Sequence, residues 1–305
     1  MEEHKDAIYV LGGLRGCKTV ELAKKYIFRQ NNPKGVVFSE RPNLYGNFLK
    51  TKILLPLLYR YLAAKYQHKI STYFAMGKLG IETFVKYGWK RDKFYPFMYQ
   101  TSFSKQLVSA PCCRNCCIKL LYVGSFDNRI KGIDILTESI NNMNYHNWSL
   151  TLIGKGGDYE QQTLAWANQH ENVTYAGVWK SEKVIENISQ YDLCLIPSRY
   201  DGWGMVTNEA LLARVGCIVS DNTGSKDLIE ASGAGMLVPA GNISALTNAL
   251  KHVVNNPDII QLWKNKAVQY AEILNSNAVN EYFLDVIQYT FDNKNNDLRP
   301  ACPWL

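Results

Sequence analysis

Short apolar runs alternate with amphipathic stretches along the C-terminal two thirds of the chain. Runs such as "YDLCLIP" at 191–197 contain few polar residues, as strands do when a parallel sheet buries both of their faces. Stretches such as "VTNEALLARV" at 206–215 place apolar residues three or four positions apart, as amphipathic helices do. This regular alternation predicts a doubly wound α/β sheet. We expect strands at 118–124, 148–154, 172–177, 191–197, 216–221 and 235–240, and helices at 131–143, 159–170, 181–190, 206–215 and 224–232.

The N-terminal third follows the same alternation less regularly. Strands are expected at 7–13, 35–40, 69–76 and 93–99, and helices near 18–30, 47–66 and 77–87. The tail from Asn242 onward is expected to be helical, at 242–255, 257–274 and 278–292. The periodicity breaks near 103–117, around Pro111. We therefore predict an N-terminal α/β domain over 1–105, a second domain over 106–280, and a C-terminal helix and tail over 281–305 that packs back on the first.

Length and composition fit two globular domains. The chain has 305 residues, of which 47% are hydrophobic and 20% charged, so it shows no signature of disorder. No apolar run reaches the roughly 18 residues of a transmembrane helix. The N-terminus, "MEEHKDAIYVLGG", is acidic and lacks the apolar core of a secretory signal, so we expect a cytoplasmic protein.

The net charge of +7 is unevenly distributed. Residues 1–110 contain 19 Lys and Arg against 7 Asp and Glu, whereas residues 111–305 contain 15 against 20. The basic part is expected to meet an anionic partner, which could be membrane lipid, a phosphorylated substrate or nucleic acid. A solvated basic face is the equally simple alternative. No nucleic-acid-binding module is recognisable, so we expect no nucleic-acid partner.

The stretch "NFLKTKILLPLLYRYLAAKYQHK" (47–69) is apolar, aromatic and basic, and contains no acid. An amphipathic helix at a membrane interface has this composition. A core helix whose Lys stems cover its rim is the alternative. Pro56 is expected to kink either one. We favour peripheral contact with an anionic membrane.

Four of the eight cysteines lie together in "PCCRNCC": Cys112, Cys113, Cys116 and Cys117. Four ligands within six residues are poorly spaced to close a tetrahedral zinc site. We therefore favour a reduced, linker-like segment over a metal site.

A loop with the properties of a phosphate site follows the strand expected at 118–124. In "YVGSFDNRIKGID", the strand ends at Gly124, Arg129 and Lys131 supply two cations, and a helix starts near Gly132. Glycine lets the backbone approach an anion, and the helix N-terminus adds positive potential. An ordinary strand–helix turn with solvated basic side chains fits these residues equally well.

Two carboxylates, Asp201 and Glu209, flank a glycine-rich turn in "SRYDGWGMVTNEAL". A helix is expected to begin near Gly204 or Met205, with its free N–H groups pointing at the strand ends. Glu209 would lie about one turn into this helix, where a carboxylate can accept two hydrogen bonds from a vicinal diol such as a ribose. Asp201 would reach another part of the same ligand. Alternatively, Glu209 is an ordinary helix-start acid stabilised by the helix dipole.

Two further turns belong to the same edge of the sheet. "IGKGGDYE" (153–160) has Tyr159 where a dinucleotide fingerprint needs its third glycine, and it lacks the GKS or GKT of a P-loop. An NAD-dependent oxidoreductase is therefore disfavoured. "DNTGSKDLIE" (221–230) supplies another glycine that opens a helix.

Taken in order, these motifs resemble family 4 of the glycosyltransferases, which have the GT-B fold of two Rossmann-like domains facing a cleft. That family has a glycine-to-KG phosphate loop, an IG-G strand end, a G-V strand end, and a block with PS, E-G-F/W-G and EA. The corresponding stretches here are "YVGSFDNRIKGID", "LIGKGGDYE", "TYAGVW" and "PSRYDGWGMVTNEALLARVG". The likeness covers about residues 75–240 and is specific only as an ordered set.

The resemblance implies a retaining, metal-independent and cofactor-free transfer from a nucleotide-diphosphate sugar. The acceptor would be a glycan or lipid-linked molecule of cell-surface polysaccharide synthesis, such as lipopolysaccharide or capsule. Glu209 would hold the ribose hydroxyls, Asp201 takes the place of the first acid near the donor sugar, and Lys131, helped by Arg129, would neutralise the leaving diphosphate. The other substrate-binding residues that it implies are Gly124, Ser125, Gly202, Trp203, Gly204, Met205, Val206, Val178 beside the base, and Glu40 at a strand end of the N-terminal domain.

The sequence departs from the family pattern in three ways. Asp201 stands where the family has glutamate, Ser125 stands where many members have arginine, and the N-terminal domain is short and expected to be incomplete. Two hypotheses follow: an active glycosyltransferase at the inner face of the cytoplasmic membrane, or a truncated, inactive nucleotide-sugar-binding protein or half of a split enzyme. We favour the first, and donor turnover without any added protein would separate them.

Overall fold

The computed structural model describes residues 7–15, 18–29, 34–45, 47–101, 117–143, 147–275, 277–292 and 298–305. The chain divides into two compact units. Unit 1 comprises Met1–Tyr99 and Asn277–Pro303, and unit 2 comprises Gln100–Ser276 and Trp304–Leu305.

Unit 1 contains a four-stranded parallel sheet in the order β1-β2-β3-β4. Its strands are β1 (Tyr9–Leu11), β2 (Gly35–Ser39), β3 (Ile70–Met76) and β4 (Phe94–Phe97), so all four strands expected in the N-terminal third are confirmed. Its helices are α1 (Lys18–Ile27), the π-helix η1 (Leu49–Leu54), α2 (Leu55–Tyr66), α3 (Gly77–Lys86) and α12 (Ala278–Phe291), with short 3-10 turns at η2 (Gln67–Lys69) and η3 (Arg91–Lys93).

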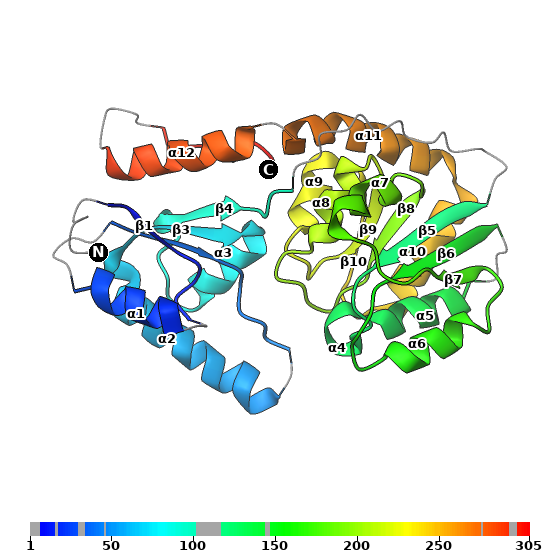
Figure 1. Ribbon diagram of the computed structural model, residues 1–305, viewed down its shortest axis with the longest axis horizontal. Helices are drawn as coiled ribbons and strands as arrows, with labels where there is room; N and C mark the ends of the chain where they lie inside the picture. Colours follow the sequence, from blue (N-terminus) through cyan, green and yellow to red (C-terminus); the bar gives the residue numbers. More distant parts are fainter. Residues whose placement is uncertain are drawn as a thin grey trace. The chain divides into compact units, whose positions relative to one another are not determined.

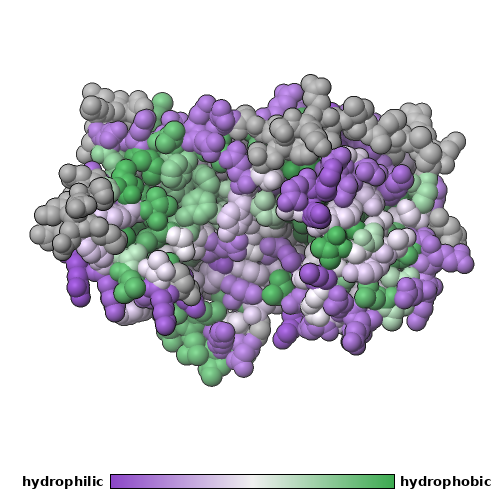
Figure 2. All heavy atoms as spheres, viewed as in Figure 1, coloured by the Kyte–Doolittle hydropathy of each residue, from purple (hydrophilic) through white to green (hydrophobic). Residues whose placement is uncertain are grey.

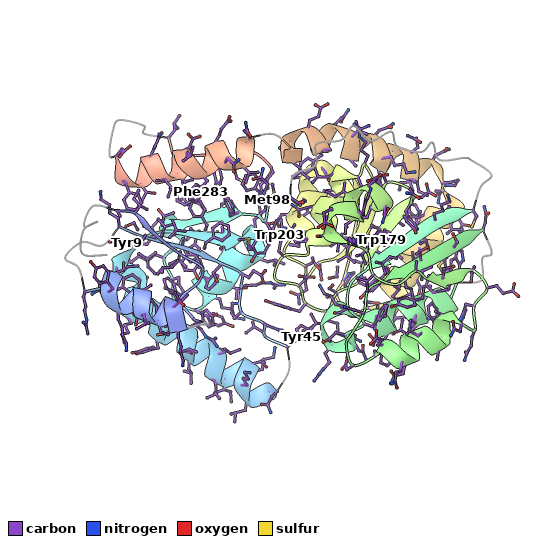
Figure 3. All side chains as sticks on the ribbon, in the orientation of Figure 1. Tyr9, Tyr45, Met98, Trp179, Trp203 and Phe283 are labelled. Atoms are coloured by element: carbon purple, nitrogen blue, oxygen red, sulfur yellow. The ribbon has the colours of Figure 1, made fainter. Side chains whose placement is uncertain are left out.

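Helices cover both faces of this sheet. Tyr73 of β3 contacts Phe84 of α3, with 4.9 Å between ring centroids, in a core that α1 and α2 also line. The next residue, Phe74, contacts Phe283 of α12 at 5.1 Å, and Figure 3 shows Phe283 between α12 and the sheet. Because successive side chains of a strand point to opposite faces, α12 covers the face opposite α1, α2 and α3.

The helix expected at 47–66 forms in two parts, η1 and α2. Pro56 is the second residue of α2, directly after the π-helical turns of η1. Proline has no N–H to donate, so the hydrogen-bonding pattern changes at the position where the sequence predicts a kink. Leu55, Leu62 and Ala63 are buried against the core, whereas other apolar residues of the segment are exposed.

Unit 2 is doubly wound, as predicted, with a six-stranded parallel sheet in the order β10-β9-β8-β5-β6-β7. Its strands are β5 (Ile118–Val123), β6 (Trp148–Ile153), β7 (Val173–Tyr175), β8 (Leu193–Ile196), β9 (Gly216–Ser220) and β10 (Gly235–Val238). All six predicted strands are confirmed. The strand order reverses between β5 and β8, and ligands of such sheets bind at the carboxyl ends of the strands beside this switch point.

Helices cover both faces of the second sheet as well. They are α4 (Asn128–Lys131), α5 (Ile133–Asn141), α6 (Glu160–Ala167), α7 (Val184–Ile188), α8 (Met205–Leu212), α9 (Lys226–Ser232), α10 (Ile243–Asn255) and α11 (Asp258–Asn275), with a 3-10 turn at η4 (Ser181–Lys183). Figure 1 shows α5, α6 and α10 on one face and α7, α8, α9 and α11 on the other. Among the described residues, no helix is both long and apolar enough to span a bilayer.

Candidate functional site

The loops that follow β5 and β8 carry most of the predicted site residues. The β5 loop begins at Gly124 and Ser125, where the Tyr122 hydroxyl donates to the Ser125 carbonyl at 2.7 Å. This bond fixes the turn before α4 begins. Gly124 and Ser125 thus lie directly beside the switch point, where the sequence places them.

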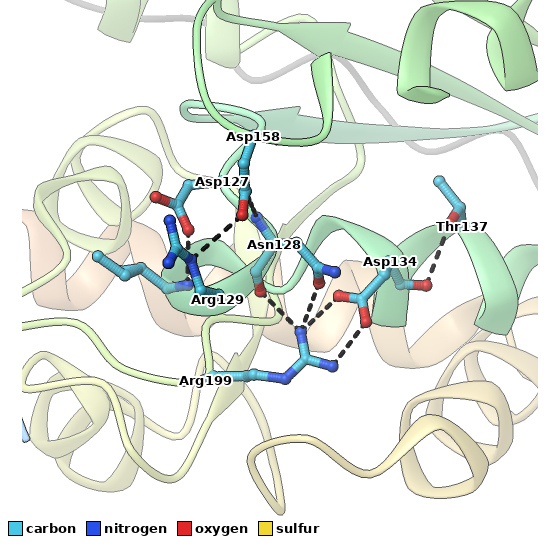
Figure 4. A network of polar contacts seen from close by, with 8 residues as sticks. Asp127, Asn128, Arg129, Asp134, Thr137, Asp158 and Arg199 are labelled. Atoms are coloured by element: carbon cyan, nitrogen blue, oxygen red, sulfur yellow. Dashed lines mark hydrogen bonds and ion pairs between the residues drawn. The ribbon is translucent and has the colours of Figure 1, made fainter. Parts of the chain in front are cut away.

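The N-terminus of α4 is already satisfied by carboxylates. Asp127 accepts from the Ile130 N–H, and Asp158, from the loop after β6, accepts from the Asn128 N–H, both at 2.9 Å. Asp158 also pairs with the Arg129 Nε at 3.2 Å, as Figure 4 shows. An anion at this helix start would meet two negative charges. Arg129 is thus directed toward Asp158, whereas the helix start that the sequence places near Gly132 is that of α5, whose N-cap Gly132 has no side chain to cap it.

Lys131 and Asp201, which the sequence places in one site, form an ion pair. Lys131 Nζ lies 2.5 Å from Asp201 Oδ2, and both side chains are partly buried. Gly132 makes this approach possible, because its φ of +65° and the Pro197 carbonyl, 2.4 Å from where a Cβ would lie, leave no room for a side chain. The pair joins the β5 loop to the β8 loop across the switch point.

The loop of Gly202 and Trp203 packs tightly against the turn after β9. A Cβ on Gly224 would lie 2.3 Å from the Gly202 carbonyl oxygen, so the two backbones are in direct contact. The Trp203 indole is 1% exposed and donates to Asn208 Oδ1 at 2.8 Å. Trp203 therefore anchors the loop from inside, and its side chain has almost no exposed surface.

The N-terminus of α8 differs from that of α4. Its cap is Gly204, at φ +91°, and no described side chain caps the helix. Met205 and Val206, the first two helical residues, have N–H groups that no intrahelical carbonyl can accept. Helix starts of this kind can bind anions, so the backbone N–H groups of Met205 and Val206 are available to an anionic ligand.

Glu209 lies one turn into α8 and is half-buried. Its carboxylate forms no hydrogen bond or ion pair with another described residue, and burial raises its pKa above the ordinary value. Its charge also contributes to the raised pKa of the buried Cys194 thiol on β8, after the larger effect of burial. A half-buried carboxylate without a partner is costly, and hydrogen-bond donors from a ligand would lower this cost.

Two predicted residues belong to other loops, one in each unit. Val178 is 55% exposed in the loop after β7, and this loop is tied to the β6 loop by the Gly154 N–H, which donates to the Gly177 carbonyl at 2.8 Å. Glu40 belongs to unit 1, where it follows β2. There Glu40 helps burial to raise the pKa of Tyr99 to about 12.

The described residues include no cluster of typical metal ligands. Among the described residues, no three His, Cys, Asp or Glu side chains are grouped so that they could hold a metal ion. Cys112, Cys113 and Cys116 lie outside the described residues, and Cys117 is an exposed free thiol.

Arg199 is a site residue that the sequence analysis does not single out. Its guanidinium grips Asp134 with two hydrogen bonds of 2.5 and 2.6 Å and donates to the backbone carbonyl and side chain of Asn128 at 2.7 and 2.8 Å (Figure 4). These contacts tie the start of α4 and the first turn of α5, which lie on either side of Lys131 in the sequence, to the β8 loop. Arg199 is a positioning residue, and its place two residues before Asp201 is the only local signal.

Replacing Arg199 with alanine is expected to destabilise unit 2 by about 2 kcal/mol, because Asp134 and Asn128 lose charge-assisted bonds in a half-buried place. Arg199→Lys should recover only part of this loss, because lysine cannot form the two-pronged pair. Urea unfolding of the full chain measures both values. Equal stability of the arginine and alanine proteins would contradict this positioning role.

The glycines of "IGKGGDYE" serve packing between loops. A Cβ on Gly157 would lie 2.3 Å from the Phe126 carbonyl carbon, and a Cβ on Gly154 would lie 1.8 Å from the Gly124 carbonyl oxygen. The Phe126 N–H donates to the Gly156 carbonyl at 2.7 Å, which closes the contact. The loop therefore supports the β5 loop through its backbone.

Gly156 and Gly157 form a matched pair for testing this role. Both have positive φ, +72° and +106°, but nothing lies within 4 Å of a Cβ on Gly156. Gly156→Ala should cost about 1 kcal/mol of strain, whereas Gly157→Ala should cost clearly more, because backbone must also move. Thermal unfolding compares the two, and an equal loss would refute the packing role.

Comparison with known proteins connects this site to an enzyme class. Residues 117–256 match the profile of a family described as "Glycosyl transferases group 1". An uncharacterized glycosyltransferase of Methanocaldococcus jannaschii is 24% identical over 140 residues, which are 46% of this chain and 39% of the relative. The matches span only 23% to 39% of the curated relatives' lengths. The resemblance to group 1 glycosyltransferases is confirmed at this level, and family 4 membership stays a prediction.

Solved structures show the same fold. The Anabaena protein HepE, in complex with UDP and glucose, aligns with a TM-score of 0.68 and 14% identity over 89% of this chain and 75% of that one. WaaG, a glycosyltransferase involved in lipopolysaccharide biosynthesis, aligns with a TM-score of 0.60 and 19% identity over 88% and 80%. At these identities the likeness concerns the fold alone, and it confirms the prediction of a GT-B α/β architecture with parallel sheets.

Proposed function

We propose that this protein is a glycosyltransferase that binds a nucleotide-diphosphate sugar at the switch point of unit 2. One observation carries the proposal: Glu209 is half-buried one turn into α8 and has no partner among the described residues. The two hydroxyls of a ribose would supply the donors that this carboxylate needs. The match of residues 117–256 to group 1 glycosyltransferases supports the assignment. The UDP bound to HepE makes UDP-sugars the first donors to test.

In this proposal the diphosphate lies at the start of α8, where the N–H groups of Met205 and Val206 donate to it. Lys131 would exchange its ion pair with Asp201 for the phosphate, which leaves Asp201 facing the donor sugar. Val178, exposed at the same edge, would lie beside the base. A fixed ammonium and backbone dipoles would stabilise the charge that develops on the leaving diphosphate, so we infer that no metal is required.

The transfer itself exchanges one bond at the anomeric carbon. The bond to the diphosphate oxygen breaks, the acceptor hydroxyl oxygen bonds to the same carbon, and the hydroxyl proton leaves with the diphosphate. We infer retention of configuration from the motif resemblance. We also infer a glycan or lipid-linked acceptor in cell-surface polysaccharide synthesis, which the fold likeness to WaaG supports.

The test is a thermal-shift and hydrolysis screen of the purified chain against UDP-, GDP-, ADP- and dTDP-sugars. A bound donor at 100 times its Kd adds about 2.7 kcal/mol of stability, enough to raise the Tm measurably. We expect one nucleotide to stabilise the protein and its sugar to be released slowly. Stabilisation by none would overturn the proposal. Stabilisation without release, even with lipid acceptors, would instead indicate a binding protein without transferase activity.

A further inference from the structure

The start of the η1–α2 segment in unit 1 exposes large apolar side chains. We call the following set the interfacial face: Phe48, Leu49, Ile53, Leu54, Leu57, Leu58 and Tyr61. Their exposed fractions run from 36% for Leu58 to 72% for Phe48. Figure 2 shows apolar surface at the lower tip of unit 1, where Figure 1 places the beginning of this helix. A contiguous apolar face of this kind marks an interaction surface.

The charge around this face has a single sign. Residues 41–81 contain no Asp or Glu, but they contain seven Lys and Arg. Lys50, Lys52, Arg60 and Lys65 lie on the same segment as the apolar residues, and all four are exposed. The neighbouring acid, Glu82, is paired with Arg91. The complementary partner is therefore a surface that is apolar and anionic together.

A pocket of about 380 Å³ opens beside the interfacial face, between the η1–α2 segment and the end of α3. Leu44, Ile53, Leu57 and Tyr87 contribute apolar walls. Three cations, Lys52, Arg60 and Lys86, also line it, and none of them forms an ion pair or hydrogen bond with another described residue. The volume falls within the range of roughly 300–1,000 Å³ that small-ligand sites occupy. We call this the basic pocket.

We propose that the interfacial face docks on an anionic lipid bilayer and that the basic pocket holds the phosphate of a lipid headgroup. Ile53 and Leu57 belong to both features, so the apolar residues would enter the acyl boundary while the three cations stay at headgroup level. Leu55, Leu62 and Ala63 hold the opposite side of the helix on the core, which fixes the orientation of the face. The inference does not depend on the activity proposed above.

The test is co-sedimentation of the full chain with vesicles. Vesicles of 30% phosphatidylglycerol in phosphatidylcholine are expected to bind the protein, vesicles of phosphatidylcholine alone to bind it weakly, and added salt to weaken binding to the first. Lys52→Glu with Arg60→Glu should weaken binding to anionic vesicles by about tenfold or more. Ile53→Ser with Leu57→Ser should also weaken it without any change of charge. All four residues are exposed, so circular dichroism should show unchanged folding.

The matched control is Lys18→Glu with Lys25→Glu, two exposed lysines of α1 in the same unit. This double variant makes the same change in net charge without touching the basic pocket, and it should keep most of the binding. If both charge variants lost vesicle binding equally, net charge alone would explain the binding, and the proposal would be overturned. Equal binding to neutral vesicles would overturn it too. The proposal would also be overturned if the wild-type protein were a dimer and Ile53→Ser with Leu57→Ser converted it to monomers, because a second copy of the chain would then occupy the interfacial face.

Discussion

Replacing Glu209 with glutamine should weaken the binding of UDP, or of whichever nucleotide the screen identifies, by about 100-fold. The carboxylate would accept two charge-assisted hydrogen bonds from the ribose hydroxyls, and glutamine retains one neutral acceptor oxygen. The same substitution should raise the Tm of the free protein, because the half-buried charge of Glu209 has no partner among the described residues. Titration calorimetry and thermal unfolding measure the two effects.

The pH dependence separates this role from a merely structural one. Burial raises the folded-state pKa of Glu209 above its ordinary value. The folded protein therefore holds the proton more tightly than the unfolded chain, and the contribution of Glu209 to stability is largest at low pH and is lost as the pH rises through the raised pKa. Nucleotide affinity should show the opposite trend and fall as the pH drops through this pKa. Glu209→Gln should lose both dependences.

Glu138→Gln is the matched control for this prediction. Glu138 is an exposed carboxylate on α5 of the same unit, and it also has no partner among the described residues. Because it is solvated, its substitution should change neither the Tm nor the nucleotide affinity. If Glu209→Gln bound the nucleotide with wild-type affinity, Glu209 would not hold the ribose, and the main support for the proposed function would be lost.

The fold of unit 2 could be predicted because parallel strands and their helices leave strong periodic signals. The stretch "LCLI" within "YDLCLIP" is apolar throughout because β8 is buried on both faces, and α8 begins at Met205, where Gly204 predicts it. The position of Glu209 one turn into the helix follows from that boundary. In these places, local chemistry and tertiary structure agree.

Other parts of the site depend on long-range pairing that no periodicity records. Arg199 meets Asp134 across 65 residues, and Asp158 fills the start of α4 from 30 residues away. Arg129, which the sequence offers as a cation for a phosphate, is paired with that carboxylate. The glycines of 154–157, which lack a dinucleotide or P-loop fingerprint, likewise contact the β5 loop through space in a way that their spacing does not record. Sequence identifies which residues could bind an anion, whereas tertiary contacts decide which remain available.

The second large effect is expected at Lys131. Lys131→Met should lower kcat/KM for transfer or donor hydrolysis by about 2–4 kcal/mol, or roughly 30- to 1,000-fold, because the leaving diphosphate loses its cation. Most of the loss should appear in kcat, since the N–H groups at the start of α8 still bind the diphosphate in the ground state. Steady-state kinetics and nucleotide titration give the two values. Lys119→Met, at the amino end of β5, should change neither.

The ion pair between Lys131 and Asp201 raises the alternative that this lysine only holds two loops together. At 2.5 Å and partly buried, the pair could stabilise the β5 and β8 loops without any part in the chemistry. Lys131→Arg keeps the positive charge and should therefore retain part of kcat. If the role of Lys131 were purely structural, kcat would fall in each variant only as far as the stability of the protein falls. Equal kcat in Lys131→Met and wild type, together with a lowered Tm, would assign the pair to the fold. A large loss of kcat at nearly unchanged nucleotide affinity would place the ammonium at the leaving group, because only the transition state carries the additional charge that it neutralises.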